Sequence, residues 1–277
     1  MAAALEQSRD YRILRRLVPR PEFAASNDEA AETALLLDVE TIGVNSTRDQ
    51  IIELGTVKFA YLPDGRTTRA RDTFSCFNQL SVAIPRGYGS HRGHNLDPNR
   101  VAAFAADAVV VIVYNAAFDR TFMERYCPSF EHQAWACSVS EIEWRSHGFE
   151  GSRLPYLLMK AGLFHEAHRA VDDCLALLEI QPLQLPDHNP TVLSALLERA
   201  RRKTTRIWAE HSPFEPKDEL KTRGYRWSDG IDGRPKSWYI DVDESDRDAE
   251  IVFLQRTIYQ REVEFRIQSL TALTAFP

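Results

Sequence analysis

Residues 34–41 read Ala-Leu-Leu-Leu-Asp-Val-Glu-Thr, an apolar run that continues directly into two carboxylates separated by a valine. A short apolar run of this kind is typical of a β-strand buried on both faces. Residues i and i+2 of a strand point to the same side, so we expect Asp38 and Glu40 to project together. Two adjacent carboxylates at the end of a buried strand repel each other and lose hydration. A divalent cation with oxygen ligands would compensate for this, whereas a strand ending at the surface would leave both acids solvated.

The composition is that of a soluble globular protein. The chain has 277 residues, 44% hydrophobic and 27% charged, enough for one large domain or a medium domain with a smaller one. No apolar run approaches the ~20 residues of a membrane span, and the N-terminus lacks the pattern of a secretory signal. The four cysteines include no Cys-x-x-Cys pair, so we expect reduced thiols in a cytoplasmic protein and no zinc site. The net charge of −6 argues against a wholly basic nucleic-acid coat, but not against a nuclease with acidic metal ligands.

Residues 1–32 are expected to form an N-terminal leader. Tyr11, Leu14, Leu17 and Val18 recur at helical spacing, which predicts a short amphipathic helix ending before Pro19. The arginines between them either contact nucleic acid or form a solvated face packed on the main domain. Residues 24–32 are small and acidic and are typical of a linker.

The segments after the opening strand predict a mixed α/β arrangement. Strands at 51–59 and 73–80, joined by short turns, indicate an antiparallel meander on one side of a sheet. A long irregular loop at 85–98 and a helix at 100–106 lead to a fully apolar strand at 109–113. Asn115 is a good N-cap for a helix running to about residue 126, which places Asp119 one turn into that helix. A short strand at 135–139 and helices at 141–144 and 154–161 follow.

His168 and Asp173 form the next pair of candidate residues. They are five positions apart, ~140° around a helix, and so do not share a helix face. They can converge if His168 precedes a helix and Asp173 lies within its first two turns. Taken singly, each residue also fits an ordinary structural position, as does Asp119 in a first helical turn.

Together these residues match the needs of phosphodiester hydrolysis, which uses carboxylates to hold cations and a base to deprotonate water. Histidine has a pKa suited to the second role. The order Asp38-Val39-Glu40-Thr41, Asn115-x-x-Phe118-Asp119 and His168-x-Ala170-x-x-Asp173 resembles the three motifs of the DEDDh (DnaQ-like) 3′–5′ exonucleases, relatives of the proofreading epsilon subunit of bacterial DNA polymerase III. The resemblance covers about residues 33–182. It implies an α/β ribonuclease H-like fold, a mixed sheet flanked by helices.

The resemblance also implies roles for individual residues. Four acids would bind two Mg²⁺ or Mn²⁺ ions, and His168 would be the general base. The acids are Asp38, Glu40, Asp119 and Asp173. The family spacing from the histidine selects Asp173 rather than its neighbour Asp172. The residues expected near the terminal nucleotide are Thr41, Ile42, Asn115 and Phe118.

Three departures from the family pattern concern substrate contacts rather than metal ligands. Ile42 stands where the family often has a second threonine, and Tyr114 stands where it commonly has histidine. Residues 85–96 lack the usual Thr-Gly-Ile pattern, which affects the expected shape of the substrate channel.

Residues 183–277 predict a small α+β C-terminal domain behind a proline-rich linker. We expect a helix from Pro190, a β-hairpin built from residues 223–227 and 237–242, and a final helix at about 246–269. Arginines and lysines alternate here with tyrosines and tryptophans, as in modules that bind single strands by phosphate pairing and base stacking. The alternative is that the aromatic residues form the core of the domain and the basic side chains are solvated.

The sequence therefore predicts a metal-dependent 3′–5′ exonuclease with a leader (1–32), a nuclease domain (33–182) and a C-terminal domain (183–277) that is a nucleic-acid-binding or interaction module. It would release nucleoside 5′-monophosphates from single-stranded or frayed nucleic acid, with DNA favoured and RNA left open as the alternative, and have replication or repair proteins as candidate partners. The competing hypothesis is an accessory nucleic-acid-binding protein of a replication or repair complex with little catalysis of its own. The intact set of acids and the histidine argue against it.

Overall fold

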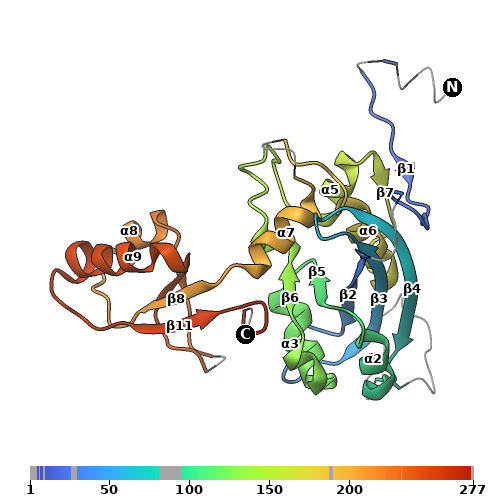
Figure 1. Ribbon diagram of the computed structural model, residues 1–277. Helices are drawn as coiled ribbons and strands as arrows, with labels where there is room; N and C mark the ends of the chain where they lie inside the picture. Colours follow the sequence, from blue (N-terminus) through green and yellow to red (C-terminus); the bar gives the residue numbers. More distant parts are fainter. Residues whose placement is uncertain are drawn as a thin grey trace. The chain divides into compact units, whose positions relative to one another are not determined.

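The computed structural model describes residues 5, 7–8, 10–25, 30–80, 95–186, 190–231 and 233–275. The chain divides into two compact units, Met1–Ala200 with Phe276–Pro277 and Arg201–Ala275 (Figure 1). The helix that the sequence predicts from Pro190 is α7 (Val192–Arg201), and its apolar residues pack in a core of the first unit. Residues 85–94 of the expected loop and 26–29 of the expected linker lie outside the described residues.

Among the helices in the described ranges, none has the length and hydropathy needed to cross a bilayer.

The first unit is built on a five-stranded mixed sheet with the strand order β4-β3-β2-β5-β6. The first three strands of the chain pair antiparallel, and β2, β5 and β6 pair parallel. This arrangement confirms the predicted meander and mixed sheet. The strands are β2 (Glu32–Thr41), β3 (Ile51–Tyr61), β4 (Thr67–Phe77), β5 (Val110–Val113) and β6 (Trp135–Cys137).

Strand β2 lies in the middle of the sheet and divides the unit into two cores. Leu36 packs in one core and Leu35 and Leu37 pack in the other, because successive side chains of a strand point to opposite faces. Helices cover both faces (Figure 1). The Leu36 side contains α5 (Leu154–Lys160), α6 (Ala170–Ile180) and α7. The other side contains α2 (Pro98–Ala105), α3 (Ala116–Tyr126) and the 3₁₀ turn η2 (Pro128–His132).

The N-terminal helix predicted from residues 11–18 is wrong, because this segment is extended. Its strand β1 (Arg15–Arg16) pairs parallel with β7 (Leu163–Phe164), and farther along Glu22 forms a bridge with Arg69 at the edge of β4. A helix this short has little stability of its own in water. In the extended segment, by contrast, backbone N–H groups form hydrogen bonds with β7, as Leu17 does with the Phe164 carbonyl oxygen.

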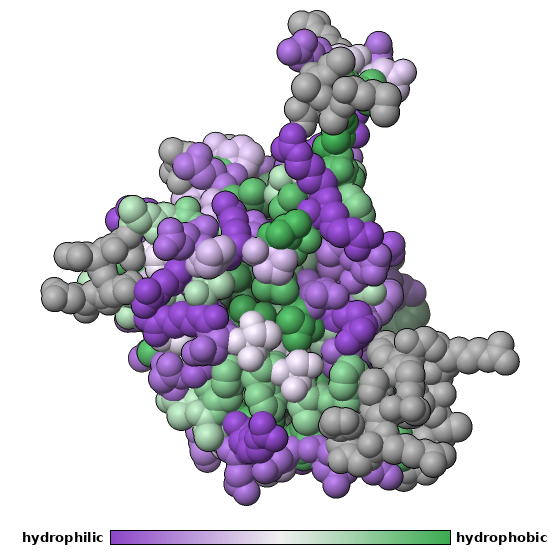
Figure 2. Space-filling view, turned by 90° about the vertical axis from the view of Figure 1, so that its right-hand side faces the viewer, coloured by the Kyte–Doolittle hydropathy of each residue, from purple (hydrophilic) through white to green (hydrophobic). Residues whose placement is uncertain are grey.

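The arginines of the leader bond to this unit. Arg20 Nε lies 3.1 Å from both carboxylate oxygens of Glu179, and Arg16 pairs with Glu166 at 2.8 Å. These contacts favour the packed-face interpretation of the leader. In the face shown in Figure 2, hydrophobic residues reach the surface in a band bordered by hydrophilic ones. Tyr11, Val18 and Phe164, at the leader and β7, are among the large hydrophobic residues that remain exposed.

The second unit is an antiparallel four-stranded sheet with the order β11-β8-β10-β9. The predicted hairpin is confirmed, since Trp238 of β10 pairs with Trp227 of β9. The prediction of a final helix at about 246–269 is wrong beyond Tyr259. Gln260 adopts a left-handed backbone (φ 51°), and the chain returns as strand β11. The elements are β8 (Thr204–Ala209), α8 (Lys217–Thr222), β9 (Arg226–Trp227), β10 (Trp238–Asp243), η3 (Glu244–Asp246), α9 (Arg247–Phe253), the π-helical turn η4 (Leu254–Tyr259) and β11 (Arg266–Leu270).

The interleaved basic and aromatic residues of this unit are used largely within it. Arg206 pairs with Asp241 at 2.7 Å, and Arg223 pairs with Glu250 at 2.9 Å. Trp208 is buried, as are Tyr225 and Tyr239. For these residues the structure favours the interpretation as a structural core, while Trp227 is 51% exposed.

Candidate active site

The candidate site lies where β2 ends. Asp38 and Glu40 follow the alternation of Ala34 and Leu36, so they project from the sheet face that α6 covers. Asp173 is in the first turn of α6. Ligand oxygens of Asp38, Glu40 and Asp173 lie within 4.8 Å of one another. Three residues far apart in the sequence thus offer oxygen ligands to one point, the donor chemistry that Mg²⁺ and Mn²⁺ prefer.

Asp119 reaches the same strand end from α3. Its Oδ1 accepts a hydrogen bond from the backbone N–H of Val39 at 3.2 Å, between Asp38 and Glu40. Burial is the main reason that the pKa of Asp119 is raised to about 7; the nearby charge of Glu40 also raises this pKa, while backbone hydrogen bonds, that from Val39 foremost, lower it. Asp119 is therefore electrostatically part of the cluster.

The electrostatic cost of the site is concentrated at Asp38. Burial raises its pKa well above the ordinary value of 3.8, and the negative charges of the neighbouring carboxylates add to the increase. Those neighbours are Asp119, Asp173, Glu40 and Glu53. Crowded, partly buried carboxylates disfavour their own ionised forms. A divalent cation would remove that cost, so the donor set and its electrostatics both fit a metal centre.

His168 precedes α6, so the geometry proposed for this pair from the sequence occurs. Its backbone is left-handed (φ 70°), and its N–H donates to Asp173 Oδ2 at 2.9 Å. The residue is exposed, and among the described residues its imidazole makes no hydrogen bond, ion pair or ring contact. The backbone of His168 thus holds Asp173, while the ring is accessible from solvent.

The position of α6 depends on Gly55. This glycine pairs with Asp38 across the β2–β3 ladder. A Cβ at Gly55 would lie 2.3 Å from the carbonyl carbon of Ala170 and 2.4 Å from the backbone nitrogen of Val171. Cys174 Sγ donates to the Gly55 carbonyl oxygen at 3.4 Å. The first turn of α6 therefore rests directly on β3, which brings Asp173 to Asp38.

Two residues of the site were not predicted from the sequence. Glu53 is buried on β3 opposite Glu40 and pairs with Arg169, with Arg169 Nε 3.1 Å from its Oε2. A lone acid in the apolar run 51–59 was a signal that could have identified it. His165 is the second: its Nε2 lies 2.6 Å from Asp173 Oδ1. It directly follows β7, whose pairing with β1 no local pattern indicates.

The residues expected near the substrate lie around this strand end. Thr41 and Ile42 are half-buried directly after the acids, and Thr41 Oγ1 donates to the Gly43 carbonyl oxygen at 2.5 Å. Asn115 occupies the N-cap position of α3 and is exposed, but its side chain makes no capping hydrogen bond. The half-buried Phe118 ring lies 5.0 Å from that of Phe122. Whether any of the four contacts a nucleotide stays a prediction.

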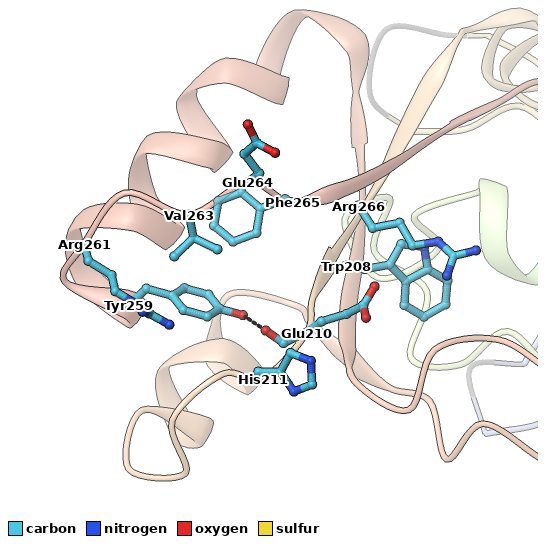
Figure 3. Close-up of a pocket in the computed structure, with 9 residues that line it drawn as sticks. All are labelled: Trp208, Glu210, His211, Tyr259, Arg261, Val263, Glu264, Phe265 and Arg266. Carbon is cyan, nitrogen blue, oxygen red and sulfur yellow. Dashed lines mark hydrogen bonds between the residues drawn. The ribbon is translucent and has the colours of Figure 1, made fainter.

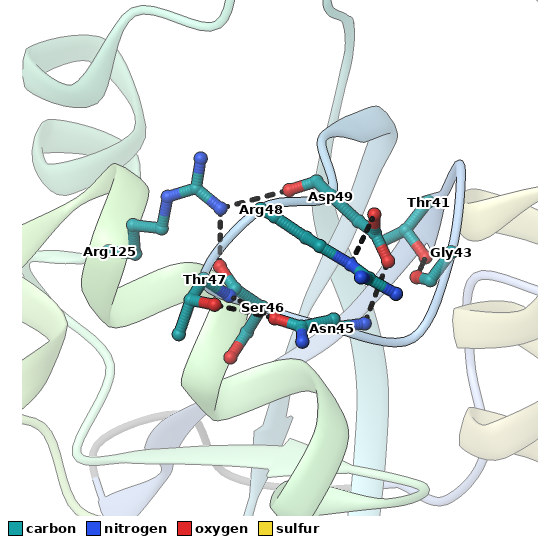
Figure 4. Close-up of polar contacts among 8 residues, drawn as sticks. All are labelled: Thr41, Gly43, Asn45, Ser46, Thr47, Arg48, Asp49 and Arg125. Carbon is teal, nitrogen blue, oxygen red and sulfur yellow. Dashed lines mark hydrogen bonds and ion pairs between the residues drawn. The ribbon is translucent and has the colours of Figure 1, made fainter. Parts of the chain in front are cut away.

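The loop after Thr41 is fixed by its own polar contacts (Figure 4). Asp49 Oδ2 accepts from the Asn45 N–H at 2.8 Å, and Asn45 Oδ1 accepts from the Thr47 N–H at 3.0 Å. Arg125 on α3 reaches across to the carbonyl oxygens of Asp49, at 2.9 Å, and Ser46. The helix that carries Asp119 thus also holds the loop that follows Asp38 and Glu40.

A separate pocket of about 320 Å³ lies in the second unit (Figure 3). It is lined by Trp208, Glu210, His211, Tyr259, Arg261, Val263, Glu264, Phe265 and Arg266. The Tyr259 hydroxyl donates to the Glu210 carbonyl oxygen at 2.6 Å. The lining mixes both charge signs, and the carboxylate cluster identified among the described residues is the one at β2. We therefore place the candidate site in the first unit.

No protein-family model matches the chain. Comparison with curated proteins likewise gave no significant match.

The solved structures similar to this chain include exonucleases. The zinc-bound complex of E. coli exonuclease I with single-stranded DNA is 14% identical, with a TM-score of 0.47, covering 76% of this chain and 63% of that chain. A 3′-exonuclease in a structure of 3′-end-specific recognition of a histone mRNA stem-loop is 13% identical, with a TM-score of 0.42, covering 60% of this chain and 68% of that one. This chain thus spans a little under two thirds of the exonuclease I chain.

Proposed function

We propose that this protein is a metal-dependent 3′–5′ exonuclease acting on single-stranded or frayed nucleic acid, with DNA as the favoured substrate. The observation that carries the proposal is the convergence of Asp38, Glu40 and Asp173 oxygens within 4.8 Å of one another. Asp119, hydrogen-bonded to the intervening Val39 backbone, supplies a fourth carboxylate. The 3′–5′ direction and the preference for DNA are carried by the motif resemblance of residues 33–182.

The four acids would hold a pair of Mg²⁺ or Mn²⁺ ions. When bound, such ions activate the attacking water and stabilise the charge that develops on the scissile phosphate and the leaving 3′ oxygen. The remaining step, removal of a proton from the attacking water, would fall to a side chain of the protein. The imidazole of His168 would take the proton from the water, a role that suits its accessible position beside Asp173. Products would be nucleoside 5′-monophosphates.

The test is degradation of 5′-labelled and 3′-labelled DNA and RNA oligonucleotides with Mg²⁺, with Mn²⁺ and with EDTA. We expect stepwise shortening from the 3′ end that EDTA abolishes. Asp38→Asn should lose activity by a factor of at least about 100, since it removes a proposed metal ligand. Asp172→Asn is the matched control, because this exposed acid adjoins Asp173 but is outside the cluster. Metal-independent cleavage, or full activity in Asp38→Asn, would contradict the proposal.

The accessory-binding alternative predicts a different result in the same experiment. Oligonucleotides would be retained on a filter by the protein but remain intact with either metal. Trp227, exposed at the edge of the second unit, is the aromatic residue to test for such binding. Loss of retention in Trp227→Ala without any cleavage by the wild type would favour the alternative.

A further inference from the structure

A second histidine, His165, contacts the proposed metal site and was not among the expected site residues. Its side chain is only 4% exposed, and its Nε2 lies 2.6 Å from Asp173 Oδ1. The other oxygen, Oδ2, accepts the His168 N–H at 2.9 Å. Asp173 is therefore held at both oxygens, one by a side chain and one by the backbone, so the rotation of its carboxylate is fixed.

We propose that His165 is a positioning residue that orients Asp173 for a divalent cation. The inference rests on the proposed function, and specifically on its metal site. A carboxylate has about four lone-pair sites on its two oxygens. The two contacts occupy one site on each oxygen and leave one on each for a cation. Hydrogen-bonded partners of this kind orient metal ligands and raise their affinity for the metal.

The fold holds His165 through the leader. Strand β7 ends at Phe164, one residue before His165, and it pairs with β1. The Arg15 N–H donates to the Gly162 carbonyl oxygen at 2.9 Å, and the Leu17 N–H donates to the Phe164 carbonyl oxygen at 2.8 Å. The backbone leading to His165 is thus fixed by the extended leader, and the backbone after it is fixed by the start of α6. The imidazole has little freedom to leave Asp173.

Substitutions at position 165 can separate the hydrogen bond to Asp173 from the space that the imidazole fills. A glutamine at position 165 can place its amide nitrogen about where the histidine Nε2 lies, and can still donate to Asp173 Oδ1. An asparagine is shorter and its amide nitrogen corresponds to the histidine Nδ1 position. His165→Gln should therefore preserve the function, whereas His165→Asn and His165→Ala should lose it.

The experiment measures Mn²⁺ binding to the full-length metal-free protein by the electron paramagnetic resonance signal of free Mn²⁺. We expect His165→Ala and His165→Asn to bind about 10- to 100-fold more weakly than the wild type. His165→Gln should stay within about threefold of the wild type, as expected when the donor is kept. His132→Ala, an exposed histidine in η2, is the matched control. Circular dichroism melts establish that each variant is folded.

The outcomes separate this inference from the proposed function. If the wild type binds Mn²⁺ and degrades oligonucleotides but all three variants at position 165 bind Mn²⁺ equally well, the positioning role is overturned and the nuclease assignment stands. Equal losses in the folded His165→Gln and His165→Ala proteins also overturn it. If the wild type binds Mn²⁺ without degrading nucleic acid, the proposed function fails, while the ordering of the variants still decides the role of His165. A wild type that binds no Mn²⁺ overturns both.

Discussion

At the scale of single residues, the site separates contacts made by backbone from contacts made by side chains. His168 donates its N–H to Asp173 from a left-handed backbone, and its exposed ring is not part of that contact. Left-handed conformations in residues other than glycine are uncommon and gather at functional positions. Apart from glycine, asparagine and aspartate are the residues that adopt the left-handed conformation most readily. A substitution can therefore remove the imidazole and keep the backbone.

His168→Asn is expected to lower the single-turnover cleavage rate by about 10²- to 10⁴-fold, the range for loss of a general base. Its Mn²⁺ affinity should change little, because the backbone donor to Asp173 is retained. Cleavage is measured on a 5′-labelled oligonucleotide under enzyme excess, and Mn²⁺ binding is measured on the same preparation. A rate within a few-fold of the wild type would exclude His168 as the base.

At the scale of elements, the position of one helix start decides whether the acids meet. The first turn of α6 lies on β3 at Gly55, with the Ala170 carbonyl carbon 2.3 Å from where a Cβ would be. The obstacle is backbone, which cannot rotate away as a side chain can. The leader also affects the site, because its strand β1 pairs with β7. Strand β7 directly precedes the segment that carries His165 and His168.

Gly55→Ala is expected to destabilise the protein by about 1–3 kcal/mol, the usual cost of inserting a methyl group into a packed interior. Displacement of α6 should also move Asp173 from Asp38, so Mn²⁺ binding should weaken in the folded variant. Thermal unfolding and Mn²⁺ titration measure the two effects.

Gly151→Ala serves as the control for this substitution, because the nearest atom to its Cβ would be Tyr156 Cδ1 at 3.9 Å. It should change neither stability nor metal binding appreciably. If Gly55→Ala behaves like Gly151→Ala, the close approach of α6 does not position the site.

At the scale of the whole molecule, the two units have separate cores and the site lies in the first. The core on the α6 face includes Val192, Leu193, Leu196 and Leu197 of α7, which are all buried. A cut after residue 180 would remove these side chains, and burying each contributes about 1.5–3 kcal/mol. The core of the first unit therefore extends to the end of α7.

A fragment ending at Arg201 is expected to unfold cooperatively and to bind Mn²⁺ as the full chain does. A fragment ending at Ile180 should be unfolded or strongly destabilised, by roughly 6 kcal/mol or more, since it loses four buried side chains. Urea unfolding followed by circular dichroism compares the two. Equal stabilities would show that α7 is not part of the core of the first unit.

The metal-free site should also make stability depend on pH. Asp119 has a pKa of about 7 in the folded protein, against an ordinary 3.8. Between these values the folded state retains a proton that the unfolded state has lost, so folding stability falls as the pH rises from about 4 to about 7. The raised pKa of Asp38 acts in the same direction.

The EDTA-treated protein is therefore expected to lose at least about 5 °C in melting temperature between about pH 5 and about pH 8. Addition of Mg²⁺ or Mn²⁺ at the higher pH should restore it, because the cations neutralise the carboxylates. Asp119→Asn keeps an oxygen acceptor for the Val39 N–H and should show a shallower decrease. Parallel pH profiles for the two proteins would contradict this origin of the pH dependence.

Features that depend on neighbouring residues could be predicted from the sequence. The apolar run before Asp38, the alternation that puts Asp38 and Glu40 on one face, and the start of a helix between His168 and Asp173 are all set by local spacing. The hairpin at Trp227 and Trp238 is of the same kind, since its two strands are adjacent along the chain. Within a single strand or helix, the side-chain period fixes which residues share a face.

Contacts between distant segments could not be predicted in this way, because they depend on the folded chain. A locally amphipathic leader became a strand because β7, about 150 residues away, offered its backbone acceptors. His165, directly after β7, meets Asp173 of α6, and Glu53 joined the acids because β3 lies beside β2. The glycine at position 55 acquired its importance only where α6 packs on it. Local periodicity records which way a side chain points, whereas the partner it meets depends on how separate elements pack.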